Sequence, residues 1–367
     1  MRKYLLLSLL SIIALCGCNH DNDDSPCAHG HCPAPIPVPT VAVPVPAAGA
    51  IAATAVVHVP PVILNGDASP PVVTLQGGIK RAVIVGINKF LDPGAPPLTG
   101  CVPDAARAYA KATGDVVATR KIFGSAADTL KIEKWAVNSW GIDPVNITLL
   151  LDEQATVANV KAALNAAVAA SKPGDSLLYW QSSHGTEDTI PDDNGAAVHG
   201  MVCCYDFGWD REHEFCDVDF KAIFSKLPDD VSFNWVSDSC NSGDLDRNVG
   251  KHKHPVRSKA LPHPPNVRLR VHAARINEAK TKGLVNGILD VGFLPGCKPD
   301  QTSADSEDDD GCPGGALSIM LMKEFDNFSD KPISALAKQV DNDLASDGYD
   351  QVCVPSGARK NKPFLKP

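Results

Sequence analysis

The chain has 367 residues, 44% of them hydrophobic, and a formal net charge of -9. This length and composition are typical of a soluble globular protein that buries a substantial core. The negative charge argues against nucleic acid as a main partner, because backbone phosphates would be repelled.

The N-terminus has the features of an export signal rather than of a folded domain. A basic start precedes an apolar run that is too short to span a membrane as a mature helix, and the run ends in Leu15-Cys-Gly-Cys18. This ending resembles a bacterial lipoprotein signal, which implies removal of residues 1–17 and a lipid on Cys18. We therefore expect an exported lipoprotein anchored in the bacterial cell envelope, with Asn19 favouring the outer membrane. The alternative is ordinary secretion with cleavage nearby.

Residues 18–77 are predicted to form an extended stalk. No charged residue lies between Pro33 and Gly66, and Pro alternates there with Ala and Val, which favours extended polyproline II structure. The stretch Cys27-Ala-His-Gly-His-Cys32 could bind a metal or close a small disulfide loop. The favoured alternative is an exposed tether whose ligand-type side chains are incidental.

The folded domain is expected over residues 78–367, where buried strands alternate with helices. The four clearest strands are predicted at 80–86, 146–151, 176–181 and 231–236, since each is a short β-branched or apolar run. A helix is predicted over 105–112, and another from Thr156, whose apolar side chains repeat on one face until Lys172-Pro-Gly174 stops it. This alternation predicts right-handed crossovers and a mostly parallel sheet.

The last third of the chain begins differently. Residues 244–283 are rich in Lys, Arg, His and Pro, and we expect an exposed basic loop there. A further strand is predicted at 284–291, and two closing helices at 314–325 and 333–345. Export implies an oxidising compartment, so Cys297 with Cys312, and a pair among Cys203, Cys204 and Cys216, are candidate disulfides.

Two short polar stretches end two of the predicted strands. Ser182-Ser-His-Gly185 follows one strand and Asp238-Ser-Cys-Asn-Ser-Gly243 follows the next. The carboxyl ends of parallel strands are where α/β sheets place reactive groups. An imidazole beside a thiol can hold the pair as thiolate and imidazolium, and backbone N–H groups at Gly185 and Cys240 are candidates for an oxyanion hole. Taken singly, Cys240 could be a buried structural cysteine and His184 a surface histidine.

From about Lys80 to Leu365 the chain resembles the caspase-like cysteine peptidases, specifically the metacaspases and their bacterial relatives. The resemblance rests on several short matches in order, and it implies an α/β fold with a mostly parallel β-sheet flanked by helices on both faces. The matching stretches are Arg81–Ile87, Leu98–Ala105, Ala155–Asn159, Gly174–Leu177, Ser182–Gly185, Asp238–Gly243, Cys297–Asp305 and Lys362–Leu365.

The resemblance implies that His184 and Cys240 form a catalytic dyad. It also implies that Asp104, Asp238 and Ser182 line the S1 pocket and select Arg or Lys, which two carboxylates would attract. The alternatives are a helix N-terminal acid for Asp104 and a turn acid for Asp238; if either does not face the pocket, cleavage would follow another residue.

The chain departs from the family pattern beside the dyad. Ser183 stands where the family usually has Gly, and Gln181 where it has an aromatic residue. Asn241 replaces the commoner His after the nucleophile. These departures leave open a rival function, a catalytically inactive caspase fold that serves as a binding or scaffold lipoprotein of the envelope.

Many relatives need Ca²⁺, which is bound by several oxygen ligands around one point. Asp217 and Asp219 lie near the family's acidic calcium motif, although Val218 interrupts it. Additional candidate ligands are Asp192, Asp193, Asp244 and Asp246. The alternative is a solvated acidic surface.

The leading expectation is a cysteine endopeptidase that cleaves peptides or proteins after Arg or Lys through a Cys240 acyl-enzyme. The segment 244–283 also carries several basic residues, which suggest that the enzyme processes itself there; a flexible covering loop is the alternative. These residues are Arg247, Lys251, Lys253, Arg257 and Lys259.

Overall fold

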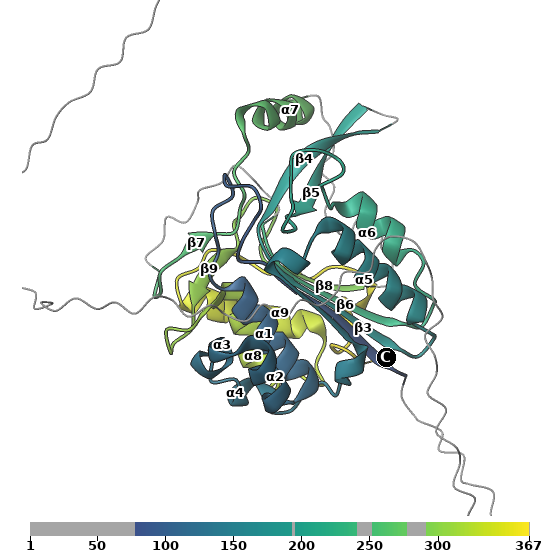
Figure 1. The fold of residues 1–367 in the computed structure, drawn as a ribbon, viewed down its shortest axis with the longest axis vertical. Coiled ribbons are helices and arrows are strands. Elements are labelled where there is room, and N and C mark those ends of the chain that lie inside the picture. The colour runs from purple at the N-terminus through teal and green to yellow at the C-terminus, as the bar shows by residue number, and fades with distance from the viewer. Residues whose placement is uncertain (1–77, 193–194, 241–251, 277–290, 367) are drawn as a thin grey trace, which may run out of the picture. The chain divides into compact units, whose positions relative to one another are not determined.

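A five-stranded parallel sheet forms the centre of the fold. The structure is a computed structural model that describes residues 78–192, 195–240, 252–276 and 291–366. The strand order is β2-β1-β3-β6-β8. Because all pairs are parallel, the carboxyl ends of the strands lie along one edge of the sheet (Figure 1). The strands are β1 (Lys80–Gly86), β2 (Ile147–Leu151), β3 (Ser176–Ser182), β6 (Ser232–Asp238) and β8 (Val291–Pro295).

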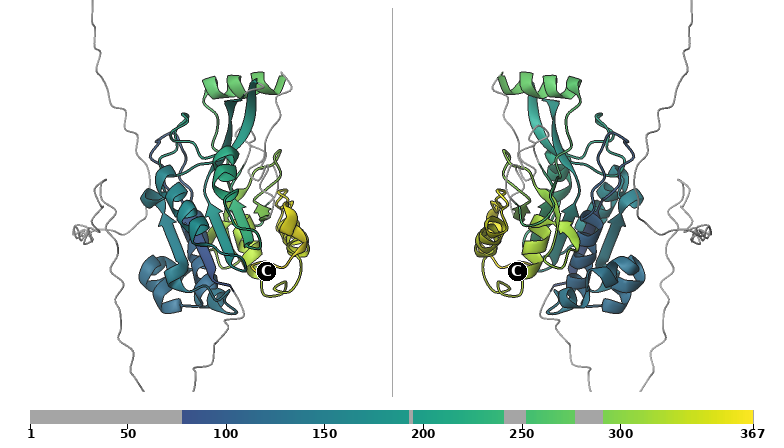
Figure 2. Two further views of the ribbon diagram at one scale, coloured as in Figure 1. Left: turned by 90° about the vertical axis from the view of Figure 1, so that its right-hand side faces the viewer. Right: turned by 90° about the vertical axis from the view of Figure 1, so that its left-hand side faces the viewer.

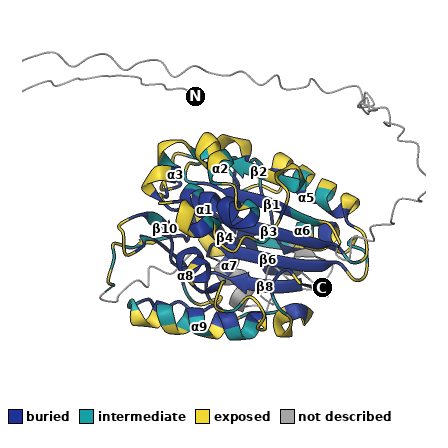
Figure 3. Cartoon of the chain, turned by 90° about the horizontal axis from the view of Figure 1, so that it is seen from below, coloured by how far each residue is buried: buried dark blue, intermediate teal, exposed yellow. Residues whose placement is uncertain are grey.

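Helices cover both faces of this sheet. Successive strand residues point to opposite faces, so an interior strand needs an apolar cover on each side. One face packs against α1 (Cys101–Thr113), α8 (Ala316–Glu324) and α9 (Ile333–Ser346). The other packs against α5 (Val157–Ala170) and α6 (Asp217–Phe224). Figure 3 shows the buried strands between these helices, which confirms the predicted fold class.

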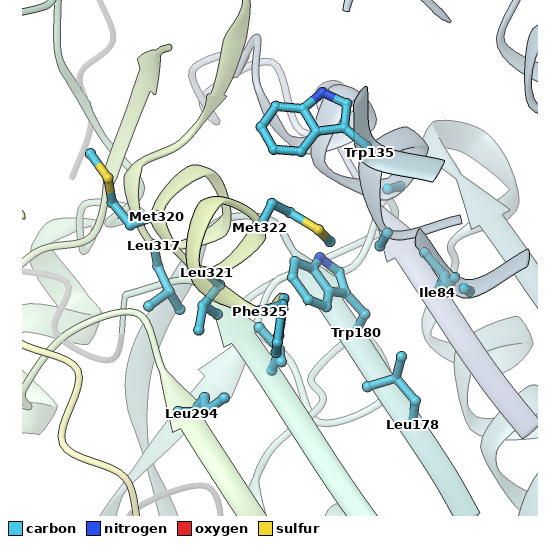
Figure 4. Packing of buried hydrophobic residues seen from close by; sticks show 14 of the residues in the cluster. Ile84, Trp135, Leu178, Trp180, Leu294, Leu317, Met320, Leu321, Met322 and Phe325 are labelled. Atoms are coloured by element: carbon cyan, nitrogen blue, oxygen red, sulfur yellow. The ribbon is translucent and has the colours of Figure 1, made fainter. Parts of the chain in front are cut away.

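Large aromatic side chains fix the strand that leads to the histidine. Trp180 of β3 is fully buried, and its ring lies 6.4 Å from that of Phe325 just beyond α8, beside Met322 (Figure 4). On the opposite face of the same strand, Tyr179 packs 5.5 Å from Trp235 of β6. Truncating a buried aromatic of this size costs about 3–5 kcal/mol. The end of β3 is therefore held firmly in place.

Most of the elements predicted from the sequence are present with small shifts in their bounds. The first four strands, the helices α1 and α5 and the closing helices α8 and α9 are confirmed. Thr156 caps α5, its side chain accepting the Asn159 N–H. Residues 284–290 of the fifth predicted strand lie outside the described residues, and β8 runs from Val291 to Pro295 instead.

The sequence did not reveal the smaller elements. The most consequential is a hairpin that begins directly after His184, formed by β4 (Gly185–Asp192) and β5 (Gly195–Val202). The other elements are α2 (Val116–Phe123), α3 (Ser125–Thr129), α4 (Glu133–Ala136), β9 (Ala304–Glu307), β10 (Pro313–Gly315) and the 3-10 turns Pro144–Asn146, Asp152–Gln154 and Ala358–Asn361.

The prediction of an exposed loop over residues 244–283 is wrong for its described part. Residues 252–276 contain β7 (Arg257–Ser258), which joins β9 and β10 in a small antiparallel sheet, and α7 (Pro265–Ile276). Figures 1 and 2 show α7 packed against the β4–β5 hairpin. Between β7 and α7, Lys259 is fully buried. Its ion pairs with Asp104 and Asp238, which are distant in sequence, outweigh the preference of the charged side chain for solvent.

None of the helices in the described ranges is long and apolar enough to cross a membrane. The predicted signal, the stalk and Cys18 lie outside the described residues.

Candidate active site

The two polar stretches singled out in the sequence meet at one edge of the sheet. β3 and β6 are neighbours, and their last residues, Ser182 and Asp238, are paired in register. His184 and Cys240 each follow two residues later, and both are fully buried. Adjacent strand ends thus bring together an imidazole and a thiol that are far apart in sequence.

Gly185 allows the two stretches to touch. A Cβ placed at this residue would lie 1.6 Å from the Cys240 carbonyl oxygen, closer than any real contact. Only glycine therefore lets the chain after His184 pass the backbone of the cysteine. This places the Gly185 N–H in the centre of the site, as its predicted oxyanion role requires.

Backbone carbonyls orient the imidazole of His184. Its Nε2 lies 2.7 Å from the Pro96 oxygen and its Nδ1 lies 3.0 Å from the Lys259 oxygen. Burial lowers the pKa of His184, while these two carbonyls act in the opposite direction. With the Nε2 proton donated to Pro96, Nδ1 is the nitrogen that faces the reacting side of the site.

Cys240 is held by the loop that precedes β9. The Ser303 N–H donates to its Sγ at 2.8 Å, a contact that stabilises negative charge on the sulfur. The thiol also packs in a small apolar cluster with Ala260 and Cys297. This packing therefore excludes water around the sulfur. One of the packed residues, Ala260, directly follows Lys259 in the chain.

The three predicted S1 residues surround a single ammonium group. The Nζ of Lys259 lies 3.1 Å from Asp238 Oδ1, 3.5 Å from Asp104 Oδ2 and 2.9 Å from Ser182 Oγ. All four side chains are buried. The carboxylates have further donors, since the Gly315 N–H bonds Asp104 and the Ser318 N–H bonds Asp238. Asp104 and Asp238 thus face the same small space, and a basic side chain fills it.

Charge and burial oppose each other in this pocket. Burial disfavours the charge of Lys259, but the carboxylates of Asp238 and Asp104 outweigh it and raise the pKa of this lysine. Burial also raises the pKa of Asp104 to about 7, even though Lys259 acts to lower it. Cys101 lines the same region, and burial raises the pKa of its thiol well above the usual value. Cys101 is therefore kept protonated and is a poor nucleophile.

The backbone of Lys259 is bound as firmly as its side chain. Its N–H donates to Ser303 O and its carbonyl oxygen accepts the Gly185 N–H, each at 2.9 Å. The preceding strand β7 pairs antiparallel with β9. The Cys240 N–H, the second predicted oxyanion donor, makes no described hydrogen bond to this oxygen. The pairing of β7 with β9 and the two backbone hydrogen bonds of Lys259 thus hold residues 257–259 across the site as an added β-strand. An extended peptide binds a sheet edge in the same way.

The departures at Gln181 and Ser183 form a connected polar network beneath the dyad. The Gln181 amide donates to Ser183 Oγ, which donates at 2.7 Å to the His184 carbonyl. On the other side, Ser237 Oγ donates to Gln181 Oε1 at 2.8 Å and contacts Ser239 Oγ at 3.0 Å. Each departure thus provides the partner that the other needs. The network links the ends of β3 and β6.

This network can be tested with Gln181→Leu, which keeps a similar volume but removes the amide. Because it removes the amide that bonds the buried hydroxyls of Ser183 and Ser237, we expect a loss of about 1–3 kcal/mol in the free energy of unfolding. Urea denaturation measures it. Gln339→Leu, on the partly exposed side of α9, is the control and should change stability by less than about 0.5 kcal/mol. Equal stability of the two variants would contradict the role of the network.

The two predicted calcium ligands are each held by basic side chains. Asp217 is paired with His199 of β5, while Asp219 contacts Arg211 at 2.9 Å and Lys161 at 3.1 Å. As the described side chains are arranged, these carboxylates do not form an open set of oxygen ligands. The Asp192 side chain and residues Asp193, Asp244 and Asp246 lie outside the described part of the chain.

The suggested disulfides are absent among the described cysteines. Cys297 Sγ donates to Gln301 O and Cys312 Sγ to Thr129 O. Cys203, Cys204 and Cys216 are buried, which raises the pKa of each thiol.

Three residues of the site carry no recognisable signal in the sequence. Lys259 lies in a stretch of many basic residues, and Ser303 in an ordinary loop. Gly315 lines the pocket so closely that a Cβ there would lie 2.1 Å from Asp238 and 2.2 Å from the Lys259 ammonium. Its place before α8 makes it look like a helix start. Only the folded chain shows that it provides space for a long side chain.

A histidine and a cysteine at adjacent strand ends of a parallel sheet, beside the Gly185 N–H, form the arrangement that the sequence predicts for a caspase-like cysteine-peptidase site. The comparisons agree, because residues 80–246 match the family model described as "Metacaspase, peptidase C14 domain". This match confirms, over residues 80–246, the resemblance to the metacaspases seen in the sequence.

Several relatives share this similarity. Metacaspase-4 of Arabidopsis thaliana is 30% identical over 175 residues, 45% of this chain and 34% of that protein. Metacaspase-1 of Scheffersomyces stipitis is 24% identical over 310 residues, 73% of this chain and 68% of that protein. The crystal structure of protein GSU0716 from Geobacter sulfurreducens has a TM-score of 0.49 and 20% identity, covering 78% of this chain and 97% of that one. The chain spans about a third of the length of the matched Arabidopsis metacaspase.

Proposed function

We propose that the protein is a cysteine endopeptidase that cleaves after Lys or Arg, with Cys240 as nucleophile and His184 as acid and base. The observation that supports this most directly is the position of Lys259. Its ammonium lies between Asp104 and Asp238 while its carbonyl oxygen accepts the Gly185 N–H. A substrate lysine would need the same contacts, and an acidic side chain would be repelled.

The proposed reaction proceeds through a thioester. The Cys240 thiolate attacks the carbonyl carbon of the basic residue, and the Gly185 N–H stabilises the developing oxyanion. The C–N bond then breaks, and the imidazolium of His184 donates its Nδ1 proton to the leaving amine. In the second half, His184 takes a proton from water, hydroxide adds to the thioester, and the C–S bond breaks to release the acid and the thiol.

The first substrate in this proposal is the chain itself, at the Lys259–Ala260 bond. Arg257 and Ser258 pair with β9 on one side of this bond, and Ala260 contacts the Cys240 cluster on the other. An intact chain is then inhibited by its own lysine, because no other basic side chain can enter the filled pocket. Self-cleavage frees the new C-terminus at Lys259 to leave.

The test compares the full chain with its Cys240→Ala and Lys259→Ala variants. The wild type is expected to yield fragments with a new N-terminus at Ala260, detected by mass spectrometry, and to hydrolyse Arg- and Lys-coumarin peptides. Cys240→Ala should do neither. Lys259→Ala should remain uncut at this bond yet hydrolyse the coumarin peptides from the start of the assay, without a lag.

Two outcomes separate the parts of this proposal. Turnover of no peptide by any variant would overturn the peptidase activity and favour the inactive scaffold. Turnover only after Asp or another residue would overturn the assignment of the pocket acids. The intact histidine and cysteine, together with the satisfied network at Gln181 and Ser183, argue for an active enzyme.

The pKa of Asp104 predicts how binding of basic substrates depends on pH. Burial raises its pKa to about 7, although the charge of Lys259 acts to lower it. Protonation removes one of the two charges that attract the substrate. We therefore expect KM for an Arg-coumarin peptide on Lys259→Ala to fall by up to about tenfold from pH 6 to pH 8. In the same background Asp104→Asn should show a flat KM over this range; a parallel fall would contradict the prediction.

We further propose that the enzyme acts in the bacterial cell envelope on protein or peptide substrates, attached through a lipid on Cys18. Mass spectrometry of the mature N-terminus, with Cys18→Ser as the control, tests this.

Calcium dependence stays a prediction from the family resemblance. Titration with Ca²⁺ against a chelator, in the wild type and in Asp217→Asn, tests it.

A further inference from the structure

The chain beyond the proposed scissile bond is bound as specifically as the chain before it. Ala260 forms a parallel bridge with Gly185, and the Leu261 N–H donates to the Gly185 carbonyl at 2.9 Å. The Leu261 carbonyl oxygen in turn accepts Thr186 Oγ1 at 3.0 Å. The first two residues after the bond therefore lie alongside the start of β4, as an extended peptide would.

The side chain of Leu261 fills an apolar recess. Leu261 is 3% exposed and belongs to a cluster with residues from three separate segments. One is the loop after β1, one is the end of β5 with the turn beyond it, and one is the residue before α6. The cluster members are Ala95, Met201, Cys203, Phe207 and Cys216. Apart from Leu261 itself, this recess belongs to the body of the enzyme and not to the segment that crosses the site.

We propose that this recess is a subsite for the second residue after the scissile bond, P2′, and that it selects an aliphatic side chain the size of leucine. The inference rests on the proposed peptidase function and on the Lys259–Ala260 register. The preferred substrate is then an extended segment with Lys or Arg at P1, a small residue at P1′ and Leu or a similar residue at P2′.

Position and chemistry support this assignment to P2′. Leu261 is the second residue past Lys259, and both of its backbone polar groups bond to β4 residues that immediately follow His184. Backbone bonds of this kind accept any sequence, so discrimination depends on the side-chain recess. A charged side chain would lose its hydration there against the apolar side chains and thiols of the cluster, which burial of a charge makes costly.

The test uses the full chain with Lys259→Ala and Leu261→Gly combined, so that neither position is filled by the enzyme's own residues. The substrates are internally quenched peptides containing Arg-Ser-Lys-Ala-X, where X is Leu, Val, Gly or Asp. We expect kcat/KM for Leu to exceed that for Asp by at least about tenfold, the usual discrimination of an apolar pocket. Lys259→Ala alone is the matched control. Its own Leu261 still occupies the recess, so the four peptides should differ by less than about twofold.

A coumarin peptide, which has no P2′ residue, separates the possible failures. If no enzyme variant hydrolyses it, the proposed peptidase function fails. If the double variant hydrolyses it but cuts all four quenched peptides equally, the peptidase function stands and the P2′ subsite is overturned. If only the variants that carry Leu261→Gly fail to hydrolyse the coumarin peptide, the double variant Lys259→Ala with Leu261→Ala replaces them. It is compared with Lys259→Ala on the same four quenched peptides.

Discussion

Asp238→Asn is expected to lower kcat/KM for Arg- and Lys-coumarin peptides by about 100-fold or more. Asp238 makes the shortest contact of either pocket acid with the Lys259 ammonium, 3.1 Å, and both groups are fully buried. Removing one member of a buried hydrogen-bonded charge pair costs about 2–5 kcal/mol, since the other charge is left without compensation. The variant should also slow cleavage at Lys259, which depends on the same contact.

The measurement is the ratio of Arg to citrulline turnover, because citrulline keeps the shape of arginine without its charge. This ratio should be large for the wild type and close to one for Asp238→Asn. Asp229→Asn, an exposed acid before β6, is the matched control and should leave the ratio unchanged. A high ratio in Asp238→Asn would show that the acid stabilises the fold without selecting the substrate.

Gly185→Ala is expected to reduce kcat by about 10²–10³-fold. A Cβ at this residue would lie 1.6 Å from the Cys240 carbonyl oxygen, so the backbone must move at the point where the Gly185 N–H donates to the Lys259 oxygen. Loss of a single oxyanion donor has an effect of this size in other acyl-transfer enzymes.

Steady-state kinetics on Arg-coumarin peptides measure this effect, and circular dichroism checks that the fold is retained. Gly94→Ala provides the control, because a Cβ there would meet only the end of the exposed Asp92 side chain, 3.1 Å away. That variant should keep its activity. If Gly185→Ala were equally active, the proposed oxyanion role of this residue would be wrong.

The positions of His184, Cys240 and the two acids could be predicted because their signals are local. His184 and Cys240 each follow an apolar run that can only be a buried strand, and parallel strands place their ends together. Asp104 lies in the first turn of a helix whose start the sequence also marks. Calcium binding stays a prediction, and the sequence could not reveal that His199, Arg211 and Lys161 contact the same carboxylates.

The effect of the two departures from the family pattern could not be judged from the chain either. Ser183 alone suggests a crowded turn beside the histidine, and Gln181 alone suggests a missing aromatic side chain. Only the pairing of β3 with β6 brings the hydroxyls of Ser237 and Ser239 to the Gln181 amide. What looked like two defects is one hydrogen-bonded network.

The sequence by itself determined the α/β architecture, the strand ends that carry His184 and Cys240, and the acids beside them. Apolar periodicity and turn residues are local properties, and they specify local structure. The tertiary structure alone decided where Lys259 lies. From the local sequence alone a lysine is expected to face solvent, because burying its charge is costly unless opposite charges lie beside it. Those charges, Asp104 and Asp238, come from the start of a helix and the end of a distant strand, so only the assembled sheet brings them to it.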